Sequence, residues 1–462
     1  MSGRRVLIAG FGTAGQSLAA DVLDAGDSVI GFLDDRRLAP EVLGVLEDVE
    51  DVVQKHSVDA VYFAIPSASG EVVREFTSRV TRAGVDLAII PRTYRIVSRE
   101  RVSVSDLTDV DVLDFVGRAP IKHDMIQAHD LIKAKRVLVT GAAGSIGSRI
   151  VSQLVALDPE LVVCVDRSEP SMFRLGQQLA NDPRVRVEMA DVQSESRMAQ
   201  LIANYQPAII FHVAAYKHVP LMQANAVEAF NNNVWGTLNV MRHAVAAGAE
   251  RVVYVSTDKA VHPTNVMGAT KRLGELVVAA MGSQGGRTRF SGVRFGNVLE
   301  SEGSVMQTFR EQLGAGRNLT VTHPDITRYF MTIDEAAQLV IQTGTRGRNG
   351  ELFVLDMGEP VRVYDLARSL IEAVNPKLDI DIIGLRPGEK MYEELSYSSS
   401  ALDATTHPKI FILSEKDEHR PANALEWIDE VLEDTRRHRI SDAELISRMR
   451  AFGFTELQSV VT

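Results

Sequence analysis

Short apolar runs alternate with amphipathic helical stretches along most of the chain, which is typical of a parallel α/β fold. The pattern begins twice, and its first start is RVLIAGFGTAGQSLAADVLDAG at residues 5–26. This segment predicts a strand, a glycine turn and an amphipathic helix. Three later apolar runs predict strands of the same sheet: VIGFLDD at 29–35, DAVYFAI at 59–65 and DLAII at 86–90.

The second start is KRVLVTGAAGSIGSRIVSQLVAL at residues 135–157, and the strand-like run LVVCVDRSE follows at 161–169. Between the two starts, residues 107–135 lack clear strand periodicity and contain a helix-like stretch. We therefore place a domain boundary near residue 121. The predicted parts are a Rossmann-like domain at 1–121, a second Rossmann domain at 122–412, and an appendage of two charged amphipathic helices at 413–462.

Length and composition narrow the class of protein. The chain has 462 residues, 45% hydrophobic and 24% charged, which predicts a globular protein of two or three domains. It has no uninterrupted apolar run of about 18 residues, so we expect no membrane span and no signal peptide. The net charge of -11 without a long Lys/Arg cluster argues against nucleic acid as a partner. The single Cys164 can form no intrachain disulfide, which is consistent with a cytoplasmic protein.

The second start carries a dinucleotide-binding signature. Gly141, Gly144 and Gly147 form TGxxGxxG between the predicted strand and helix. This spacing lets the backbone approach a pyrophosphate at the helix N-terminus, where unpaired N–H groups and the helix dipole favour an anion. The alternative is a glycine turn that merely permits tight packing.

Residues at the ends of the next two strands indicate how a nucleoside would be bound. Asp166 lies 19 residues after Gly147, where a carboxylate binds a ribose diol and repels a 2′-phosphate. Arg167 beside it can offset that repulsion, so NAD is favoured and NADP stays open. Asp191 and Val192 follow the strand-like run VRVEMA and suit an adenine contact.

The first start has the same spacing. Gly10, Gly12 and Gly15 fit GxGxxG, and Asp34 also lies 19 residues after the last glycine. No set of catalytic residues follows before residue 121. Two interpretations stay open: an occupied nucleotide or nucleotide-sugar site, and a structural or oligomerising domain that has kept the turn.

Seven segments occur in the order of one known family: TGAAGSIGS, FHVAAYKHVPLM, NNNVWGT, VSTDKAVHPTNVMGATKR, VRFGNVL, VTHPDITRYFMTIDEAAQLV and LRPGEKMYEEL. With them the chain resembles the capsule and O-antigen nucleotide-sugar 4,6-dehydratases (CapD-like), extended short-chain dehydrogenases best known for acting on UDP-N-acetylglucosamine. The resemblance covers about residues 118–412 and implies a small C-terminal substrate-binding subdomain. The first 117 residues look like the Rossmann-like domain of the long members, whose usual membrane helices we do not expect here.

The reaction of that family moves a hydride from C4 of the sugar to C6 and eliminates water between C5 and C6. By resemblance, Asp258 is the acid at the C6 oxygen and Lys259 is the base at C5. Lys259 serves as a base only if its pKa falls well below the free value of about 10.4. We expect burial and a nearby Lys271 to lower this pKa and Asp258 to oppose the change. The alternative is a surface Asp–Lys pair in a loop.

Position 267 departs from the usual short-chain dehydrogenase site. A tyrosine four residues before the lysine normally removes the hydroxyl proton, but here Met267 precedes Lys271, and a thioether exchanges no proton. Long members of the family carry the same methionine, which argues against an inactive enzyme. The 4-hydroxyl proton then passes to the Thr257–Lys259 cluster, which we favour, or to a water held by Lys271. Met267 itself is also expected to be a packing residue on an amphipathic helix.

The resemblance assigns two sets of binding residues. Those expected at the cofactor are Gly141, Gly144, Ser145, Ile146, Gly147, Asp166, Arg167, Asp191, Val192, Ala214, Ala215 and Lys271, the last at the nicotinamide ribose unless it lies on a solvated helix face. Those expected at the substrate are Lys217 at the sugar, Arg328, Arg386 and Asn297 at the diphosphate, and Glu389 at a nucleoside ribose. No metal is expected.

Glu300 and Glu302 stand where the family usually has glycine and a small or polar residue. Two carboxylates beside a diphosphate would cost energy, so they point away from it or recognise a different sugar. The leading hypothesis is an NAD-dependent UDP-sugar 4,6-dehydratase that forms a homo-oligomer. A nucleotide-sugar epimerase and a non-catalytic nucleotide-sugar or NAD-sensing protein are the alternatives.

Overall fold

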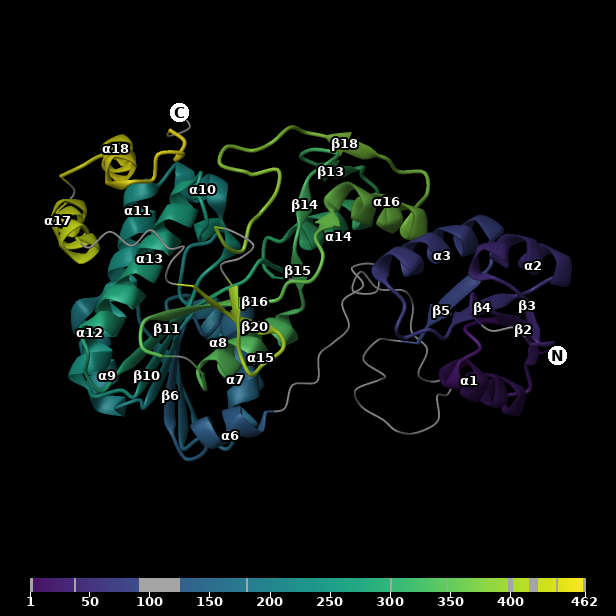
Figure 1. The fold of residues 1–462 in the computed structure, drawn as a ribbon, viewed down its shortest axis with the longest axis horizontal. Helices are drawn as coiled ribbons and strands as arrows, with labels where there is room; N and C mark the ends of the chain where they lie inside the picture. Colours follow the sequence, from purple (N-terminus) through teal and green to yellow (C-terminus); the bar gives the residue numbers. More distant parts are fainter. Residues whose placement is uncertain are drawn as a thin grey trace. The chain divides into compact units, whose positions relative to one another are not determined.

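The computed structural model describes residues 3–36, 39–90, 125–179, 182–299, 301–346, 348–397, 402–414, 423–437 and 439–459. The chain divides into two compact units, shown in Figure 1. The first contains residues 1–122, 308–325 and 361–383, and the second contains 123–307, 326–360 and 384–462. The predicted boundary near residue 121 falls outside the described residues. The division also differs from the contiguous domains expected from the sequence, because two segments within 122–412 join the first unit.

The first unit is built on a five-stranded parallel sheet in the order β3-β2-β1-β4-β5. Its strands and helices are β1 (Arg5–Ala9), α1 (Thr13–Asp24), β2 (Ser28–Leu33), β3 (Val42–Gly44), η1 (Leu46–Asp48), α2 (Val49–His56), β4 (Ala60–Phe63), α3 (Gly70–Ala83) and β5 (Asp86–Ile89). The four strands and the helix predicted in residues 5–90 are confirmed. The later segments add β13 (Leu319–Val321), α16 (Val363–Val374) and β18 (Ile380–Ile382). The helix α14 (Val305–Gly314) begins in residues of the second unit and continues into the segment 308–325 of the first.

The second unit contains a nine-stranded sheet in the order β19-β20-β16-β11-β10-β9-β6-β7-β8. Its strands are β6 (Arg136–Thr140), β7 (Leu161–Asp166), β8 (Val185–Met189), β9 (Ile209–His212), β10 (Arg251–Val255), β11 (Arg289–Arg294), β16 (Glu351–Leu355), β19 (Leu402–Ala404) and β20 (Ile410–Leu413). From β8 to β16 all pairs are parallel, whereas β20 and β19 are antiparallel. The strand order reverses between β6 and β9, and ligands of such folds bind at the carboxyl edge of that switch point.

Helices cover both faces of this sheet because its strands bury side chains on both sides (Figure 1). Along β10, Val252 and Tyr254 belong to one hydrophobic cluster, whereas Val253 and Val255 belong to the other. One face carries α9 (Glu195–Tyr205), α12 (Gly236–Ala246) and α13 (Val266–Ser283), and the other carries α6 (Ile126–Ile132), α7 (Ser145–Val155), α8 (Glu169–Leu179) and α15 (Ile333–Thr343). Short elements complete the unit: α10 (Val219–Gln223), α11 (Ala226–Phe230), η3 (Asn231–Trp235), η4 (Asp258–Ala260), β12 (Asn297–Val298), β14 (Thr327–Arg328) and β15 (Phe330–Met331). The short strand β17 (Val361–Arg362) belongs to the first unit.

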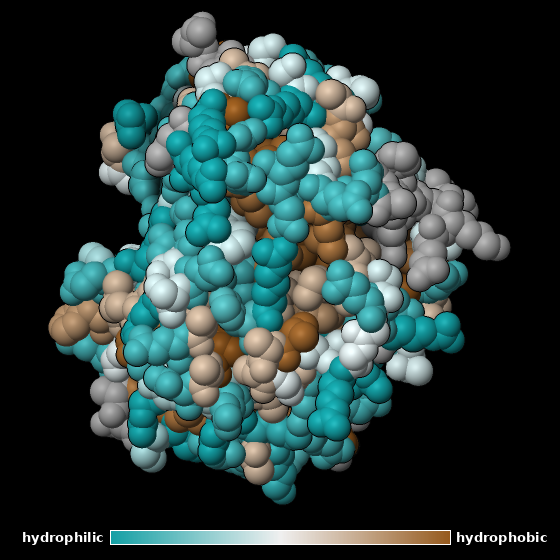
Figure 2. All heavy atoms as spheres, turned by 90° about the vertical axis from the view of Figure 1, so that its left-hand side faces the viewer, coloured by the Kyte–Doolittle hydropathy of each residue, from teal (hydrophilic) through white to brown (hydrophobic). Residues whose placement is uncertain are grey.

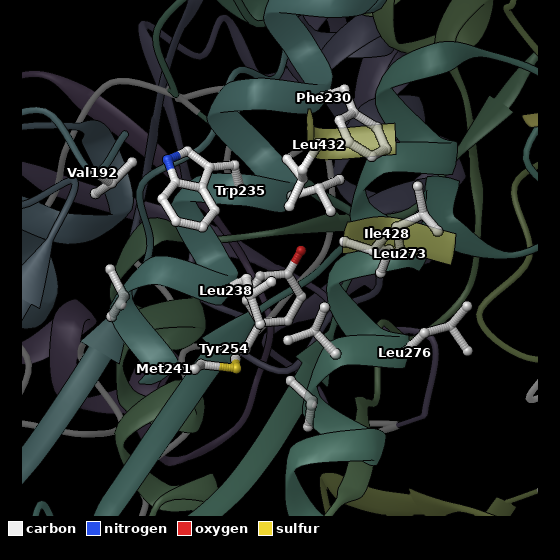
Figure 3. Packing of buried hydrophobic residues seen from close by; sticks show 14 of the residues in the cluster. Val192, Phe230, Trp235, Leu238, Met241, Tyr254, Leu273, Leu276, Ile428 and Leu432 are labelled. Atoms are coloured by element: carbon white, nitrogen blue, oxygen red, sulfur yellow. The ribbon is translucent and has the colours of Figure 1, made fainter. Parts of the chain in front are cut away.

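The two helices predicted after residue 412 are α17 (Ala424–Arg436) and α18 (Asp442–Phe452). They are part of the core of the second unit, because Ile428 and Leu432 are buried against Phe230 and Leu273 (Figure 3). Seen from the side on which α12 and α17 lie, the surface is largely hydrophilic, with hydrophobic residues in the hollows between polar ones (Figure 2). Among the described residues, no helix is long and apolar enough to cross a membrane.

Candidate active site

The glycine turn between β6 and α7 has the geometry that a pyrophosphate requires. Gly141 has a φ of +68°, and an added Cβ would lie 2.6 Å from the Ala214 backbone nitrogen. A Cβ on Gly147 would lie 2.0 Å from the Gly141 carbonyl oxygen, so helix and turn touch through their backbones. Gly144 precedes α7 without a side-chain hydrogen bond to the first turn, which leaves backbone N–H groups of that turn available to an anion.

Ser145 and Ile146 form the start of α7 beside this turn. The Ser145 hydroxyl accepts a hydrogen bond from the backbone N–H of Glu302 at 3.0 Å, so the loop after β12 reaches the glycine turn. Glu302 is exposed. Burial lowers the pKa of Lys217, and the charge of Glu302 opposes this change without cancelling it. Glu300 lies outside the described residues.

Asp166 ends β7 and binds the glycine turn of its own unit. Its Oδ2 accepts a hydrogen bond from the Ala143 backbone N–H at 3.2 Å, and its Oδ1 accepts one from Ser168 at 3.0 Å. The carboxylate therefore lies beside the turn, at the place where a ribose diol would bind.

Asp34 in the first unit repeats this arrangement. Its Oδ2 accepts a hydrogen bond from the Phe11 backbone N–H at 2.7 Å, and its Oδ1 accepts one from Arg36 at 2.8 Å. Gly10 opens the turn with a φ of +106°. The two units therefore share the strand, the turn and the carboxylate that binds the turn.

Arg167 has its charge engaged by neighbours. Its guanidinium lies 4.3 Å from the centre of the Tyr216 ring and 3.3 Å from Asp191 Oδ2. Val192 is buried, and its carbonyl accepts a hydrogen bond from Asn239 at 2.7 Å. Arg167, Asp191 and Val192 therefore lie together at the ends of β7 and β8, and their assignment to an adenosine site stays a prediction.

Ala214 and Ala215 follow β9, and the backbone of Ala214 lies against Gly141. Behind them lies His212, which the sequence analysis did not single out. It is fully buried and bridges the hydroxyls of Thr140 at 2.7 Å and Thr237 at 2.9 Å. Burial, with a smaller effect of the Lys271 charge, lowers the pKa of His212 to about 3, so this side chain is a neutral structural link.

Thr257, Asp258 and Lys259 follow β10 and are joined by hydrogen bonds. Thr257 Oγ1 donates to Asp258 Oδ1 at 2.8 Å, and Lys259 Nζ donates to the same oxygen at 3.0 Å. Asp258 is completely buried, and its Oδ2 has no hydrogen-bond partner in the described part of the chain. The predicted cluster is therefore a buried constellation in the structure, and the alternative of a surface Asp–Lys pair is wrong.

The lowered pKa that a base role requires of Lys259 is not found. Burial lowers its pKa, but Asp258 and Glu393 outweigh burial, and the pKa of Lys259 lies above its ordinary value. Glu393 Oε1 lies 3.6 Å from Lys259 Nζ, and the Glu393 side chain is 4% exposed. Sequence reasoning missed Glu393, although it lies in the quoted motif LRPGEKMYEEL.

Lys271 and Met267 lie in the buried part of α13. The Lys271 ammonium is 4.1 Å from the centre of the Tyr254 ring and makes no hydrogen bond among the described residues. Burial lowers the pKa of Lys271 to about 7, with the charge of Glu275 opposing the change. Met267 is 4% exposed and belongs to the hydrophobic cluster on this face of the sheet, which supports its interpretation as a packing residue.

A buried ion cluster lies below these residues and was not predicted. Glu275 accepts hydrogen bonds from Arg294 at 2.6 and 2.7 Å, from Arg272 at 3.0 Å and from the Ser256 hydroxyl at 2.5 Å. Burial raises the pKa of Glu275, but the two arginines and the serine outweigh it and the pKa is lowered. Both guanidiniums lie 5.6 Å from the Tyr397 ring centre. Because Ser256 directly precedes Thr257, the cluster fixes the carboxyl end of β10.

The residues expected at the substrate make specific contacts with one another. Asn297 Oδ1 accepts a hydrogen bond from Lys259 Nζ at 3.0 Å, so its side chain faces the cluster of Thr257, Asp258 and Lys259. Arg328 is buried and donates to Glu389 Oε1 at 3.1 Å, which pairs two side chains predicted as separate ligands. Arg386 is exposed, and its guanidinium has no hydrogen-bond partner among the described residues.

The parallel sheet, the glycine turn at its switch point and the lysine on α13 define an extended short-chain dehydrogenase fold. Residues 137–415 match the family model described as polysaccharide biosynthesis protein, and residues 1–91 match the one described as CoA-binding domain. The chain belongs to the polysaccharide biosynthesis protein family.

Two curated relatives of the chain have different descriptions. The chain is 38% identical over 426 residues to the capsular polysaccharide biosynthesis protein CapD of Staphylococcus aureus, covering 88% of this chain and 71% of that protein. It is 33% identical over 279 residues to a UDP-glucose 4-epimerase of Rickettsia rickettsii, covering 58% of this chain and 80% of the epimerase.

Two solved structures have the same fold. Pen from Bacillus thuringiensis is 32% identical with a TM-score of 0.58, over 65% of this chain and 98% of Pen. DesIV from Streptomyces venezuelae, a dTDP-glucose 4,6-dehydratase solved with NAD, is 24% identical with a TM-score of 0.51, over 56% of this chain and 88% of DesIV. At that identity DesIV supports the fold alone.

Proposed function

We propose that the chain is an NAD-dependent nucleotide-sugar 4,6-dehydratase that acts on UDP-N-acetylglucosamine and forms a UDP-4-keto-6-deoxy-hexose. The observation that carries this proposal is the buried cluster of Thr257, Asp258 and Lys259 at the carboxyl end of β10. An epimerase needs proton transfer only at the 4-hydroxyl, whereas this cluster supplies an acid and a base as well.

The residues of the second unit fit a nicotinamide dinucleotide. The turn at Gly141 and the start of α7 would hold the pyrophosphate, and Asp166 would bind the adenosine ribose. Because Arg167 is held by Asp191 and Tyr216, it is poorly placed to bind a 2′-phosphate, and we favour NAD over NADP. Bound there, the nicotinamide would accept the C4 hydride and deliver it to C6. Lys271 would bind the nicotinamide ribose.

The hydrogen bond between Lys259 and Asp258 provides the acid and the base together. Lys259 carries a proton in the free protein, since its pKa is raised. Transfer of that proton over 3.0 Å to Asp258 Oδ1 breaks an ammonium N–H bond and forms a carboxylic acid and a neutral amine. The amine takes the C5 proton, and the acid protonates the C6 hydroxyl, which leaves as water while the electrons of the C5–H bond form the C5–C6 double bond. Lys259 returns a proton to C5 when C6 receives the hydride.

Thr257 is the group that we assign to the 4-hydroxyl in place of the missing tyrosine. Its hydroxyl, which donates to Asp258 Oδ1 at 2.8 Å, takes the sugar proton while its own proton passes to solvent, because Asp258 must still be ionised when it receives the proton of Lys259. A proton taken up from solvent after the hydride has reached C6 returns the Asp258–Lys259 pair to the single proton that it held at the start. Met267 takes no part, because a thioether transfers no proton.

On the substrate side, Arg386 is the cation that is free to bind the diphosphate. Arg328 binds it only if it exchanges or shares its contact with Glu389, which would bind the nucleoside ribose. In this proposal Lys217 and Asn297 contact the sugar, and Asn297 is hydrogen-bonded to Lys259. The backbone of Glu302 is hydrogen-bonded to Ser145 at the glycine turn. A homo-oligomeric state and a cytoplasmic location remain predictions.

A second candidate is a nucleotide-sugar epimerase, favoured by the identity with the Rickettsia enzyme. Incubation of the pure protein with UDP-N-acetylglucosamine in D2O, followed by mass spectrometry, separates the two. A dehydratase product loses one water and gains one deuterium at C5, whereas an epimerase product keeps the substrate mass. Unchanged substrate across several nucleotide hexoses, together with tight binding, would support the third hypothesis of a non-catalytic binding protein.

A further inference from the structure

Three segments that are far apart in the sequence meet at one junction in the second unit. They are the loop 384–391, which carries Arg386 and Glu389, the loop 261–265 before α13, and the segment 457–459 after α18. We call this meeting point the Gln458 junction. None of its contacts belongs to the acid–base cluster described above.

The two loops bind each other through Gly388. Its carbonyl accepts hydrogen bonds from Asn265 Nδ2 at 3.0 Å and from Thr264 Oγ1 at 3.2 Å. Gly388 has a φ of +78°, and an added Cβ would lie 2.6 Å from the Cβ of Asn265, so a side chain does not fit here. Asn265 also caps α13, because its Oδ1 accepts the Gly268 N–H at 2.8 Å. The loop 384–391 is thereby connected to the helix that carries Lys271.

Gln458 closes the junction from the other side. Its side-chain oxygen accepts the Gly388 N–H at 2.7 Å, and its backbone N–H donates to the Thr264 carbonyl at 3.0 Å. The carbonyls of Gln458 and Ser459 accept hydrogen bonds from the buried Gln223 side chain at 2.9 and 3.1 Å. Both backbone polar groups of Gly388 are therefore satisfied by side chains from other segments.

The segment 457–459 is itself held firmly. Leu457 is 2% exposed and belongs to the hydrophobic cluster that also contains residues of α17 and α18. Arg450 donates to the Leu457 carbonyl at 2.8 Å and to the Ser459 hydroxyl at 3.0 Å. A side chain on such a backbone can hold a loop, because little of its own freedom remains to be lost.

The loop needs this support because its ligand-binding side chain is otherwise unconstrained. The Arg386 guanidinium is exposed. Among the described residues only the backbone of Arg386 is hydrogen-bonded: its N–H donates to Glu389 Oε2 at 3.1 Å, and its carbonyl accepts the Glu389 N–H at 3.0 Å. Where Arg386 lies is therefore decided by where the loop lies. A loop that is ordered before binding avoids the entropy cost of ordering it on binding.

We propose that Gln458 is a positioning residue that holds the loop 384–391 in place for a nucleoside diphosphate. The inference rests on the proposed function in one respect, the assignment of Arg386 to the diphosphate. It adds a binding role to a region that the sequence analysis treated as an appendage without one.

Direct binding of UDP to the full chain, measured by calorimetry, tests the proposal. Gln458→Met keeps the length of the side chain and removes its acceptor, so we expect the Kd for UDP to rise about three- to tenfold. The KM for the nucleotide sugar rises with it, while kcat changes less than about twofold. Ser459→Ala is the matched control, since it removes the contact of this segment with Arg450 in α18 but none with the loop. An unchanged Kd in Gln458→Met overturns the proposal.

A double substitution separates positioning from general stability. In an Arg386→Ala background, we expect the effect of Gln458→Met on the Kd to shrink below about twofold, because both changes act through one contact. An undiminished effect would show that Gln458 acts on the whole unit, and would also overturn the proposal.

Hydrogen exchange distinguishes failure of this inference from failure of the proposed function. The amides of 384–391 exchange faster in Gln458→Met than in wild type or Ser459→Ala, whether or not UDP binds. Equal exchange rates refute the junction. Wild-type protein that binds no UDP refutes the proposed substrate instead.

Discussion

Glu393 lies 3.6 Å from the ammonium of Lys259, and its second carboxylate oxygen has no hydrogen-bond partner in the described part of the chain. Burial raises the pKa of Glu393, the charges of Lys259 and Arg328 lower it, and the net change is upward. Together with Asp258, Glu393 holds the pKa of Lys259 above its ordinary value, so in the proposed mechanism Lys259 stays protonated until it passes its proton to Asp258.

This relationship predicts the pH dependence of the Glu393→Gln variant. The competent cluster holds one proton on the Asp258–Lys259 pair, and activity is lost as pH rises through the raised pKa of Lys259. Removing the Glu393 charge lowers that pKa, so the high-pH limb of kcat/KM moves to lower pH. Glu394→Gln is the matched control, because Glu394 is bonded to His262 and not to Lys259. A high-pH limb that stays at its wild-type position in Glu393→Gln would contradict this account.

Asp258→Asn should abolish most of the elimination while leaving the site folded. Loss of a positioned acid typically costs 10²- to 10⁴-fold, and we expect kcat for the 4-keto product to fall within about that range. Because the amide has nearly the shape of the carboxylate, the Kd for UDP should remain within about twofold of wild type. Product formation is followed by liquid chromatography and mass spectrometry. A fall of less than about tenfold would remove Asp258 from the acid role.

Lys271→Met should stabilise the protein, and more so at acid pH. The pKa of Lys271 is lowered from 10.5 to about 7 by burial, so between these values the unfolded chain binds more protons than the folded one. Stability linked to Lys271 therefore rises with pH from about 7 upward, and the cost of burying the charge is fully present below pH 7. The Tm of Lys271→Met should exceed that of the wild type by more at pH 6 than at pH 9. The corresponding difference in the free energy of unfolding is a few kcal/mol.

The control for this stability measurement is Lys135→Met, whose side chain is 37% exposed in an ion pair with Glu250. Its effect on Tm should be small and nearly independent of pH over the same range. A Tm difference for Lys271→Met that does not change between pH 6 and pH 9 would mean that Lys271 is not buried as a charge.

Glu275→Gln should destabilise the second unit strongly. The change leaves the buried guanidiniums of Arg272 and Arg294 without the carboxylate between them, and removal of one partner of a buried ion pair costs about 3–5 kcal/mol. Breaking the exposed pair of Arg242 and Asp429 with Arg242→Gln should cost less than about 1 kcal/mol. Urea denaturation measures both. Similar midpoints for the two variants would contradict the role assigned to Glu275.

The sequence predicted the sheet and the glycine turns well because their signals are local. The apolar runs 5–9 and 136–140 are followed by glycine turns in which Gly15 and Gly147 approach the carbonyls of Gly10 and Gly141, only five or six residues before them. The cluster after β10 was also predicted, since Thr257, Asp258 and Lys259 are consecutive. The parallel strands of the second unit then place its glycine turn and this cluster along one edge of the sheet, which is a general property of the fold.

What could not be predicted depends on contacts between distant segments. Glu393 is part of the motif LRPGEKMYEEL, but nothing in the neighbouring sequence shows that it lies against Lys259. Without Glu393, the pKa of Lys259 was expected to shift in the wrong direction. Arg328 and Glu389 were assigned to separate parts of the substrate, whereas they bind each other. The role proposed for Gln458 depends on hydrogen bonds between the segment after α18 and two loops far earlier in the sequence, at Thr264 and Gly388.

The similar glycine turns of the two units affect how experiments on the first turn should be interpreted. Asp34 and Asp166 each bind the backbone of their own turn before any ligand arrives. An acidic residue in this place is thus part of the scaffold of the loop, and its presence is compatible with an empty pocket. An Asp34→Asn variant would change loop geometry and ribose recognition at the same time, so a loss of ligand in that variant cannot be assigned to either cause alone.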